Sequence, residues 1–74
     1  MKTISKSDYY KTIGLLTLAK SHHDKLLDIE DSLCEILDEE KDSSGYSGHI
    51  GDSIWSEQYS ADELLKKLEI KVED

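Results

Sequence analysis

Residues 8–42 read DYYKTIGLLTLAKSHHDKLLDIEDSLCEILDEEKD, and this stretch decides how the chain is expected to fold. Apolar and small side chains recur in it at alternating steps of three and four residues, a spacing that keeps them on one side of an α-helix. We call this set the seam, and it consists of Thr12, Leu15, Ala19, His22, Leu26, Ile29, Leu33 and Ile36. No proline interrupts the stretch, so the spacing predicts one long amphipathic helix over residues 7–41.

The polar segment Lys20–Asp24 leaves a second interpretation open, in which the stretch breaks into two helices that form a hairpin. The seam keeps its phase through this segment, with Ala19, His22 and Leu26 in register. Because a break has no reason to preserve the phase, the pattern favours the continuous helix.

Residues 42–59 differ sharply in composition from the stretch before them. They contain three of the four glycines, which is typical of a loop with backbone positions at positive φ. The loop also contains Ile50, Ile54 and Trp55, which are too large and apolar for a plain tether. We expect these side chains to form a short helical turn that folds back on the long helix, with Trp55 as the anchor.

Capping signals mark where the helices begin. Ser5 is a candidate N-cap for the long helix, and Ser7 competes with it. Ser60 and Glu63 form a capping box, which predicts a short C-terminal helix over residues 60–69. The tail, residues 70–74, is expected to be extended, because the chain has no other strand candidate with which it would pair.

These elements predict a single all-α domain over residues 1–74. A core of this size yields only about 3–5 kcal/mol of net stability, so an additional source of stability is expected. Cys34 is the single cysteine, and no Cys/His quartet has zinc-finger spacing. Oligomerisation remains, and we expect a homodimer whose interface is formed by Leu15, Ala19, His22, Leu26, Ile29, Leu33 and Ile36.

Charge is distributed unevenly along the long stretch. Residues 1–27 carry five lysines and two acids, whereas residues 28–42 carry eight acids and only Lys41. In one continuous helix this distribution opposes the macrodipole, which favours acids near the N-terminus and bases near the C-terminus. Antiparallel pairing of two copies, crossing near residues 24–27, would place the lysines of one beside the acids of the other. The sequence therefore predicts an antiparallel homodimer.

The net charge of −8 and the absence of arginine argue against direct binding of nucleic acid or of an anionic membrane. A basic protein suits an acidic chain better as a partner. The N-terminal residues lack the apolar core of a signal peptide, and no segment has the length of a membrane span. With a lone thiol, the expected location is the cytoplasm.

An acidic stripe is the most informative surface feature of the predicted helix. The simplest interpretation is a solvated outer face that keeps a small protein soluble. The more specific hypothesis is a docking surface for a basic partner, with two aromatic residues beyond the stripe as anchors. The candidate partner-binding residues are Asp28, Asp31, Glu35, Asp38, Asp42, Tyr46 and Trp55.

Residues 51–54, GDSI, are similar to the nucleophile block of the GDSL-type serine hydrolases. The Asp-x-x-His block of that family has no counterpart, because no histidine follows Ser53. Asp52 is more simply interpreted as the N-cap of a turn that runs through Trp55.

Metal sites are equally incomplete in the sequence. His22 and His23 have leucines at the i+4 positions where a second ligand is usual. Asp38, Glu40 and Asp42 imitate the start of a calcium loop, but serine and histidine occupy the positions that require glycine and glutamate. We therefore predict no catalytic, cofactor or metal site, and no enzymatic activity.

The leading hypothesis is a small acidic interaction protein that binds and modulates or inhibits a protein partner. One candidate partner is a nucleic-acid-binding protein whose basic groove the acids imitate. Small acidic chains without proline, arginine or a catalytic constellation are similar in composition to accessory proteins encoded by phages and mobile elements. The alternatives are a structural or assembly protein whose long helix mediates oligomerisation, and a metal-dependent factor.

Overall fold

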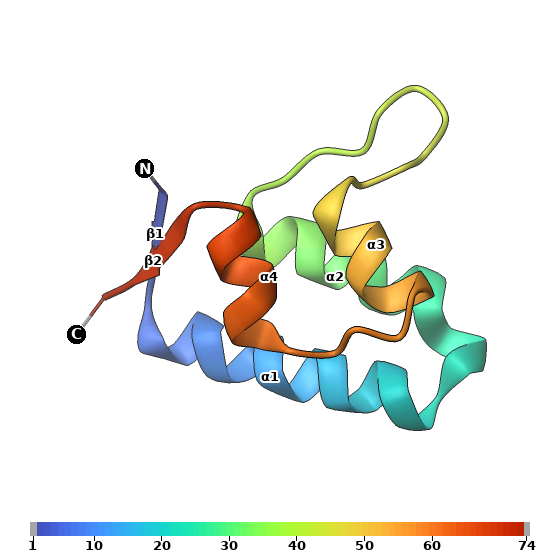
Figure 1. Ribbon diagram of the computed structural model, residues 1–74, viewed down its shortest axis with the longest axis horizontal. Helices are drawn as coiled ribbons and strands as arrows, with labels where there is room; N and C mark the ends of the chain where they lie inside the picture. Colours follow the sequence, from blue (N-terminus) through green and yellow to red (C-terminus); the bar gives the residue numbers. More distant parts are fainter. Residues whose placement is uncertain (1, 74) are drawn as a thin grey trace.

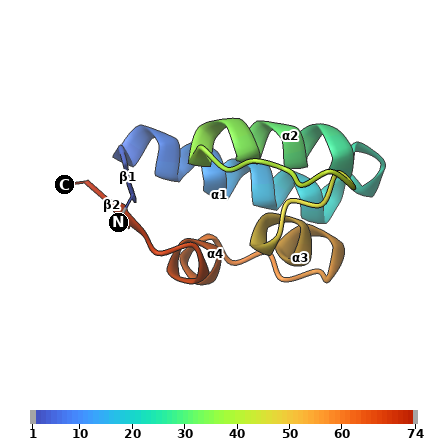
Figure 2. The same ribbon diagram turned by 90° about the horizontal axis from the view of Figure 1, so that it is seen from above.

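The computed structural model describes residues 2–73 and consists mainly of helices. The elements in chain order are β1 (Lys2–Ile4), α1 (Lys6–Ser21), the 3₁₀ turn η1 (His23–Lys25), α2 (Leu26–Leu37), α3 (His49–Trp55), α4 (Ala61–Lys67) and β2 (Ile70–Val72). Helices α1 and α2 lie side by side as one layer, and α3 and α4 form the second layer (Figure 2). The predicted helical class is confirmed, with a small parallel sheet added.

The prediction of one continuous helix is wrong, because the chain turns at His22 and returns as an antiparallel hairpin (Figure 1). His22 leaves the helical region with φ −131° and ψ 73°, while its N–H still donates to the carbonyl of Leu18 at 2.7 Å. The N–H of Lys25 then donates to the carbonyl of His22 at 3.0 Å, which forms the short 3₁₀ turn. The hairpin lets one chain bury both halves of its own apolar face without a second copy.

The break removes part of the conflict between charge and helix dipole. With two helices, Lys20 lies in the last turn of α1, and Asp28 lies in the first turn of α2. Both positions are favourable, because the helix dipole stabilises bases at C-termini and acids at N-termini. Lys6 at the start of α1, and Glu35 and Asp38 at the C-terminal end of α2, remain at unfavourable positions.

The core lies between the two layers and corrects the predicted dimer interface. Ala19, Leu26, Ile29 and Leu33 are buried inside the single chain, so they are not available as an interface between copies. Two other predicted interface residues, Leu15 and Ile36, are only half-buried, and His22 is exposed in the turn. Leu16 and Leu37 occupy the core positions that Leu15 and Ile36 were expected to fill.

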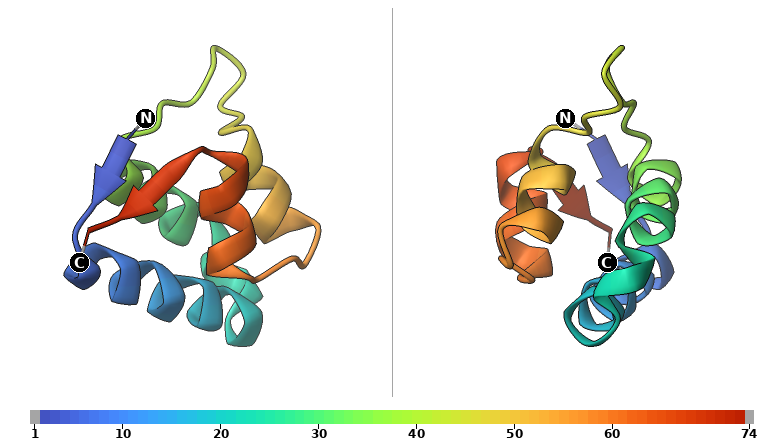
Figure 3. Two further views of the ribbon diagram at one scale, coloured as in Figure 1. Left: turned by 60° about the vertical axis from the view of Figure 1, so that its left-hand side comes forward. Right: turned by 90° about the vertical axis from the view of Figure 1, so that its right-hand side faces the viewer.

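Helix α3 packs against α2 as the predicted turn that folds back (Figure 3). Ile50 and Ile54 are one helical turn apart and almost fully buried, so they anchor the segment. Trp55 is 56% exposed, and its predicted role as the anchor is wrong. The residue after Ile54 is rotated by about 100° around the helix, which turns Trp55 away from the core.

Two predicted helix starts are confirmed. The hydroxyl of Ser5 accepts a hydrogen bond from the N–H of Asp8 at 3.1 Å, which makes Ser5 the N-cap of α1. The hydroxyl of Ser60 accepts one from the N–H of Glu63 at 3.3 Å, as its capping box predicts. The structure thus selects Ser5 over the competing cap Ser7 and confirms Ser60.

The two ends of the chain meet in a parallel two-stranded sheet (Figures 1 and 3). Lys2 pairs with Ile70 and Ile4 pairs with Val72, and both isoleucines are buried against the helices. The expectation of an unpaired extended tail is wrong for residues 70–72. The partner strand lies at the opposite end of the sequence, where three residues carried no strand signal.

Candidate protein-binding face

The predicted acidic stripe is divided between a helix and a loop. Asp28, Asp31 and Glu35 are exposed on one face of α2, as their spacing predicts. Helix α2 ends at Leu37, and Asp38 follows as its C-cap with a left-handed backbone, φ 54° and ψ 47°. Asp38 and Asp42 therefore lie in the loop before α3, which corrects their predicted place on a continuing helix.

A buried glutamate fixes this loop to α2. Glu30 faces the interior and is only 3% exposed, although it lies one residue before the exposed Asp31. Its carboxylate accepts a hydrogen bond from the hydroxyl of Ser47 at 2.7 Å, and Lys41 Nζ lies 3.8 Å from its second oxygen. Lys41 also pairs with Asp31, and this hydrogen bond is the main reason that the pKa of Lys41 is raised. The lysine thus joins the loop to α2 through two carboxylates.

Gly51 provides the space that this arrangement needs. A Cβ atom at this position would lie 3.2 Å from the hydroxyl oxygen of Ser47 and from the ring of Tyr46, and 3.4 Å from the carboxylate of Glu30. Glycine therefore allows α3 to approach the buried glutamate closely. This packing role explains the glycine of the GDSI tetrapeptide without any hydrolase chemistry.

Asp42 organises the tip of the loop. One of its carboxylate oxygens accepts hydrogen bonds from the Ser44 hydroxyl at 2.6 Å, the Ser44 N–H at 2.9 Å and the Tyr46 N–H at 3.0 Å. These donors, with the Ser44 hydroxyl as the largest cause, hold the pKa of Asp42 below its usual value. The loop is rich in glycine and serine, but internal hydrogen bonds define its shape.

The two predicted aromatic anchors lie in different places. The hydroxyl of Tyr46 donates to the carboxylate of Asp52 on α3, a hydrogen bond that raises the pKa of Tyr46. Tyr46 thereby stays beside the acidic loop, and it is 47% exposed. Trp55 closes α3 at the end that points away from the loop, toward the turn between α1 and α2 (Figure 1). Tyr46 is therefore part of the acidic loop, whereas Trp55 is the last residue of α3 and lies outside it.

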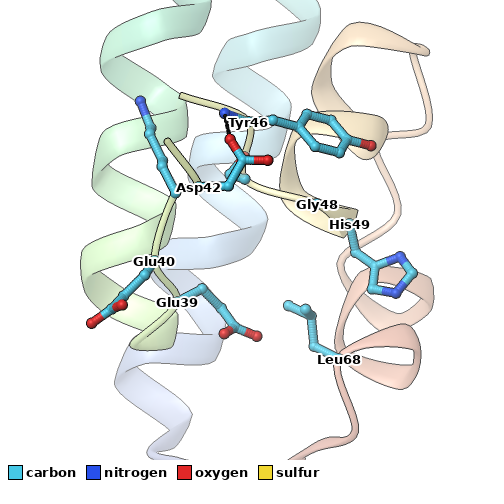
Figure 4. A pocket seen from close by; sticks show the side chains of 9 residues that line it. Glu39, Glu40, Asp42, Tyr46, Gly48, His49 and Leu68 are labelled. Carbon is cyan, nitrogen blue, oxygen red and sulfur yellow. Dashed lines mark hydrogen bonds between the residues drawn. The ribbon is translucent and has the colours of Figure 1, made fainter. Parts of the chain in front are cut away.

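An open hollow of about 400 Å³ lies between the loop and the second layer. In Figure 4, Asp42 and Tyr46 lie on the loop side, and His49 and Leu68 approach from α3 and the end of α4. Glu39 at this hollow pairs with Lys2 of β1, whose Nζ lies 2.9 Å away. Glu40 and Asp42 contribute negative charge at the rim, and Leu68 provides an apolar wall.

Ser53 lies on α3, His22 ends α1 and His23 begins the 3₁₀ turn. Ser53 is 3% exposed and turned inward. His22 caps α1, whereas Nε2 of His23 lies 3.1 Å from the hydroxyl of Tyr59. Within residues 2–73, no group of three His, Cys, Asp or Glu side chains is arranged to hold a metal ion.

The sequence pattern did not single out Glu30, Lys41 or Ser47, which together determine the shape of the loop. A signal for Glu30 was present in its spacing. It lies four residues after Leu26 and three before Leu33, which places it beside the buried face of α2. A glutamate at such a position requires buried partners, because an unpaired buried charge is costly.

Among the described residues 2–73, none of the helices is both long enough and apolar enough to cross a membrane. Comparisons of this chain with protein-family models, with curated proteins and with solved structures find no match.

Proposed function

We propose that this chain is a non-enzymatic binding protein that docks a basic partner protein on its acidic face. We define the acidic face as the exposed acids of α2 and of the loop that follows, namely Asp28, Asp31, Glu35, Asp38, Glu40 and Asp42. The observation that carries this proposal is the imbalance of charge across residues 28–42. Eight acids lie there with Lys41 alone, and this lysine is already paired with Glu30 and Asp31.

The hollow beside the acidic face suits a lysine or arginine side chain of the partner. Carboxylates at its rim attract the cation, and the exposed ring of Tyr46 lies beside it. Tyrosine and arginine are both enriched among the residues that dominate binding energy at protein interfaces. Leu68 contacts the apolar part of a long basic side chain, which covers apolar surface while its charged end stays among the acids.

The hydrogen bonds within the loop support a binding role. A flexible loop loses conformational entropy when it docks, and this loss weakens affinity. Here Asp42 already holds Ser44 and Tyr46, and Glu30 already holds Ser47. The acidic loop is therefore preorganised before a partner arrives.

The specific form that we favour is a modulator or inhibitor whose partner is itself a nucleic-acid-binding protein. Proteins of that class carry clustered lysine and arginine, because binding to a phosphate backbone requires them. The acidic face would occupy such a basic surface and compete with the nucleic acid for it. The compositional similarity to accessory proteins of phages and mobile elements agrees with this role.

The proposal is tested by titrating the isotope-labelled full chain with octa-lysine and following its amide resonances by NMR. We expect the largest shifts on α2 and in residues 38–48, with a decrease as salt is raised from about 0.1 M to about 1 M, where the Debye length falls to about 3 Å. Asp31→Lys/Glu40→Lys should abolish these shifts. Asp62→Lys/Glu63→Lys, which reverses two exposed acids on α4, should preserve them. Shifts of equal size on both faces would contradict a localised binding face.

A further inference from the structure

The C-terminal end of α2 holds the ammonium group of Lys2, a residue of β1 that lies 35 positions before the end of the helix. Lys2 Nζ donates hydrogen bonds to the carbonyl oxygens of Leu37 at 3.1 Å and of Asp38 at 2.7 Å. A carboxylate oxygen of Glu39 lies 2.9 Å from the same nitrogen. An ammonium group has three N–H donors, so these oxygens match it in number. The end of α2 is therefore an ammonium site, and the chain's own lysine occupies it.

The backbone at the end of α2 creates this site. Asp38 has left-handed backbone angles, and the N–H of Glu39 donates to the carbonyl of Cys34 at 2.9 Å, which ends the helix in a Schellman-type motif. The last carbonyl groups of a helix carry the negative end of its dipole, which attracts a cation. The last turn of α2 contains no base, so the cation comes from a distant part of the chain.

The ammonium site borders the acidic face. Asp38 belongs to that face, and Glu39 also lines the hollow in which Tyr46 and Leu68 lie (Figure 4). The side chains of Lys2 and Glu39 are 38% and 26% exposed, so the contact between them is open to solvent. A cation that enters the hollow therefore competes with Lys2 for the carboxylate of Glu39.

We propose that a lysine side chain of the basic partner takes the ammonium site and displaces Lys2, which makes Lys2 an autoinhibitory residue. The exchange replaces one ammonium group with another, so the three oxygens keep their donors and water solvates the freed Lys2. Strand β1 stays paired with β2, because it pairs through its backbone and only a side chain leaves the site. The role of the partner rests on the proposed function, whereas the ammonium site does not.

Chemical rescue of a Lys2→Ala variant of the full chain tests the site without a partner protein. Retained helical circular dichroism would show that the variant folds, and Lys2→Met, which keeps the apolar stem, is the second variant. We expect n-butylammonium, added to about 0.2 M at constant ionic strength, to return the amide resonances of Asp38 and Glu39 toward their parental positions. Tetramethylammonium carries the same charge without an N–H donor and should have no such effect. Equal effects of the two cations, or no effect of either, would overturn the proposal.

Titration with octa-lysine tests the autoinhibition. Lys2→Met should raise the affinity for octa-lysine by about threefold or more, because the site loses an internal competitor that is always close to it. Lys6→Met removes the same charge from an exposed position at the start of α1 and should raise the affinity by less than about twofold. Adding Glu39→Gln to Lys2→Met should cancel most of the gain. A gain no larger than that of Lys6→Met would overturn the autoinhibitory role.

The two experiments separate this inference from the proposed function. Rescue by n-butylammonium, without octa-lysine binding to the parent or to Lys2→Met, would confirm the ammonium site and contradict the proposed function. Octa-lysine binding that Lys2→Met leaves unchanged, without rescue by n-butylammonium, would overturn the inference and leave the proposed function intact.

Discussion

The two faces of α2 share one backbone but contribute differently to the molecule. Its inner face carries Leu26, Ile29, Leu33 and Leu37, which are between 0 and 7% exposed, together with the buried Glu30. Its outer face carries Asp28, Asp31 and Glu35, all of them exposed. The inner face is the source of folding free energy, and the outer face carries the charge available to a partner. Changes on one face should therefore leave the property of the other intact.

Two leucines of α2 provide the largest test of this difference. Leu33 is fully buried, and Leu33→Ala should lower the free energy of unfolding by about 2–5 kcal/mol, because it removes apolar contacts and leaves a cavity. Leu27 is 64% exposed, and Leu27→Ala should change it by about 0.5 kcal/mol or less. Urea unfolding followed by circular dichroism measures both variants. Similar losses in the two would show that α2 is not oriented as described.

The buried glutamate gives the next largest effect. Glu30→Ala removes the acceptor of the Ser47 hydroxyl and one carboxylate beside Lys41, so the free energy of unfolding should fall by about 1–3 kcal/mol. Glu35→Ala, on the outer face, should change it by about 0.5 kcal/mol or less.

A double-mutant cycle isolates the hydrogen bond between Glu30 and Ser47. Glu30→Ala/Ser47→Ala should lose less stability than the sum of the two single variants, because the second substitution removes the group that the first leaves unpaired. Additive losses would mean that the two side chains do not interact in solution.

The smallest effect concerns pH and the loop beyond α2. The folded pKa of Asp42 is lowered from 3.8, so its carboxylate stabilises the folded state above that value. This contribution is lost as the pH falls below 3.8 and through the lower folded pKa. Asp42→Asn should therefore show a smaller fall in melting temperature between about pH 5 and about pH 2 than the parent.

Asp28→Asn is the control for this pH dependence, because Asp28 lies on the open outer face of α2. It should retain more of the parental pH dependence than Asp42→Asn does. The reverse order would place the acid-sensitive contact on α2 and not in the loop.

Several features of the fold were predictable because they depend on neighbouring residues. The N-caps at Ser5 and Ser60, the α4 helix and the burial of Ile50 and Ile54 all follow from short-range spacing. The charge distribution also indicated a hairpin. Lysines before residue 28 and acids after it suit the dipoles of two helices better than the dipole of one. The seam residues keep one helical phase through His22, and this concealed the break. The phase does not distinguish the two interpretations, because each helix of a hairpin turns its own apolar face inward whatever the phase between them.

The candidate site was only partly predictable. Asp28, Asp31 and Glu35 share a face because helical spacing places them there. Tyr46 belongs to the acidic loop because it follows Asp42 by four residues, and Trp55 is outside that loop as the last residue of α3. How α3 packs against α2 depends on contacts between distant residues. Sequence spacing does not encode that docking, because Gly51 and Glu30 are 21 positions apart and meet only in the folded chain.

The sequence by itself determined the helical class, the helix starts, the excess of acid in residues 28–42 and the seam residues Ala19, Leu26, Ile29 and Leu33. Only the tertiary structure decided that this seam is covered by the chain's own second layer, that residues 2–4 pair with residues 70–72, and that Glu30 anchors the loop. The physical reason is the range of the interactions. Capping and helical periodicity act within a few residues, whereas an apolar face is covered by segments that are distant in the sequence and become neighbours only in the folded chain.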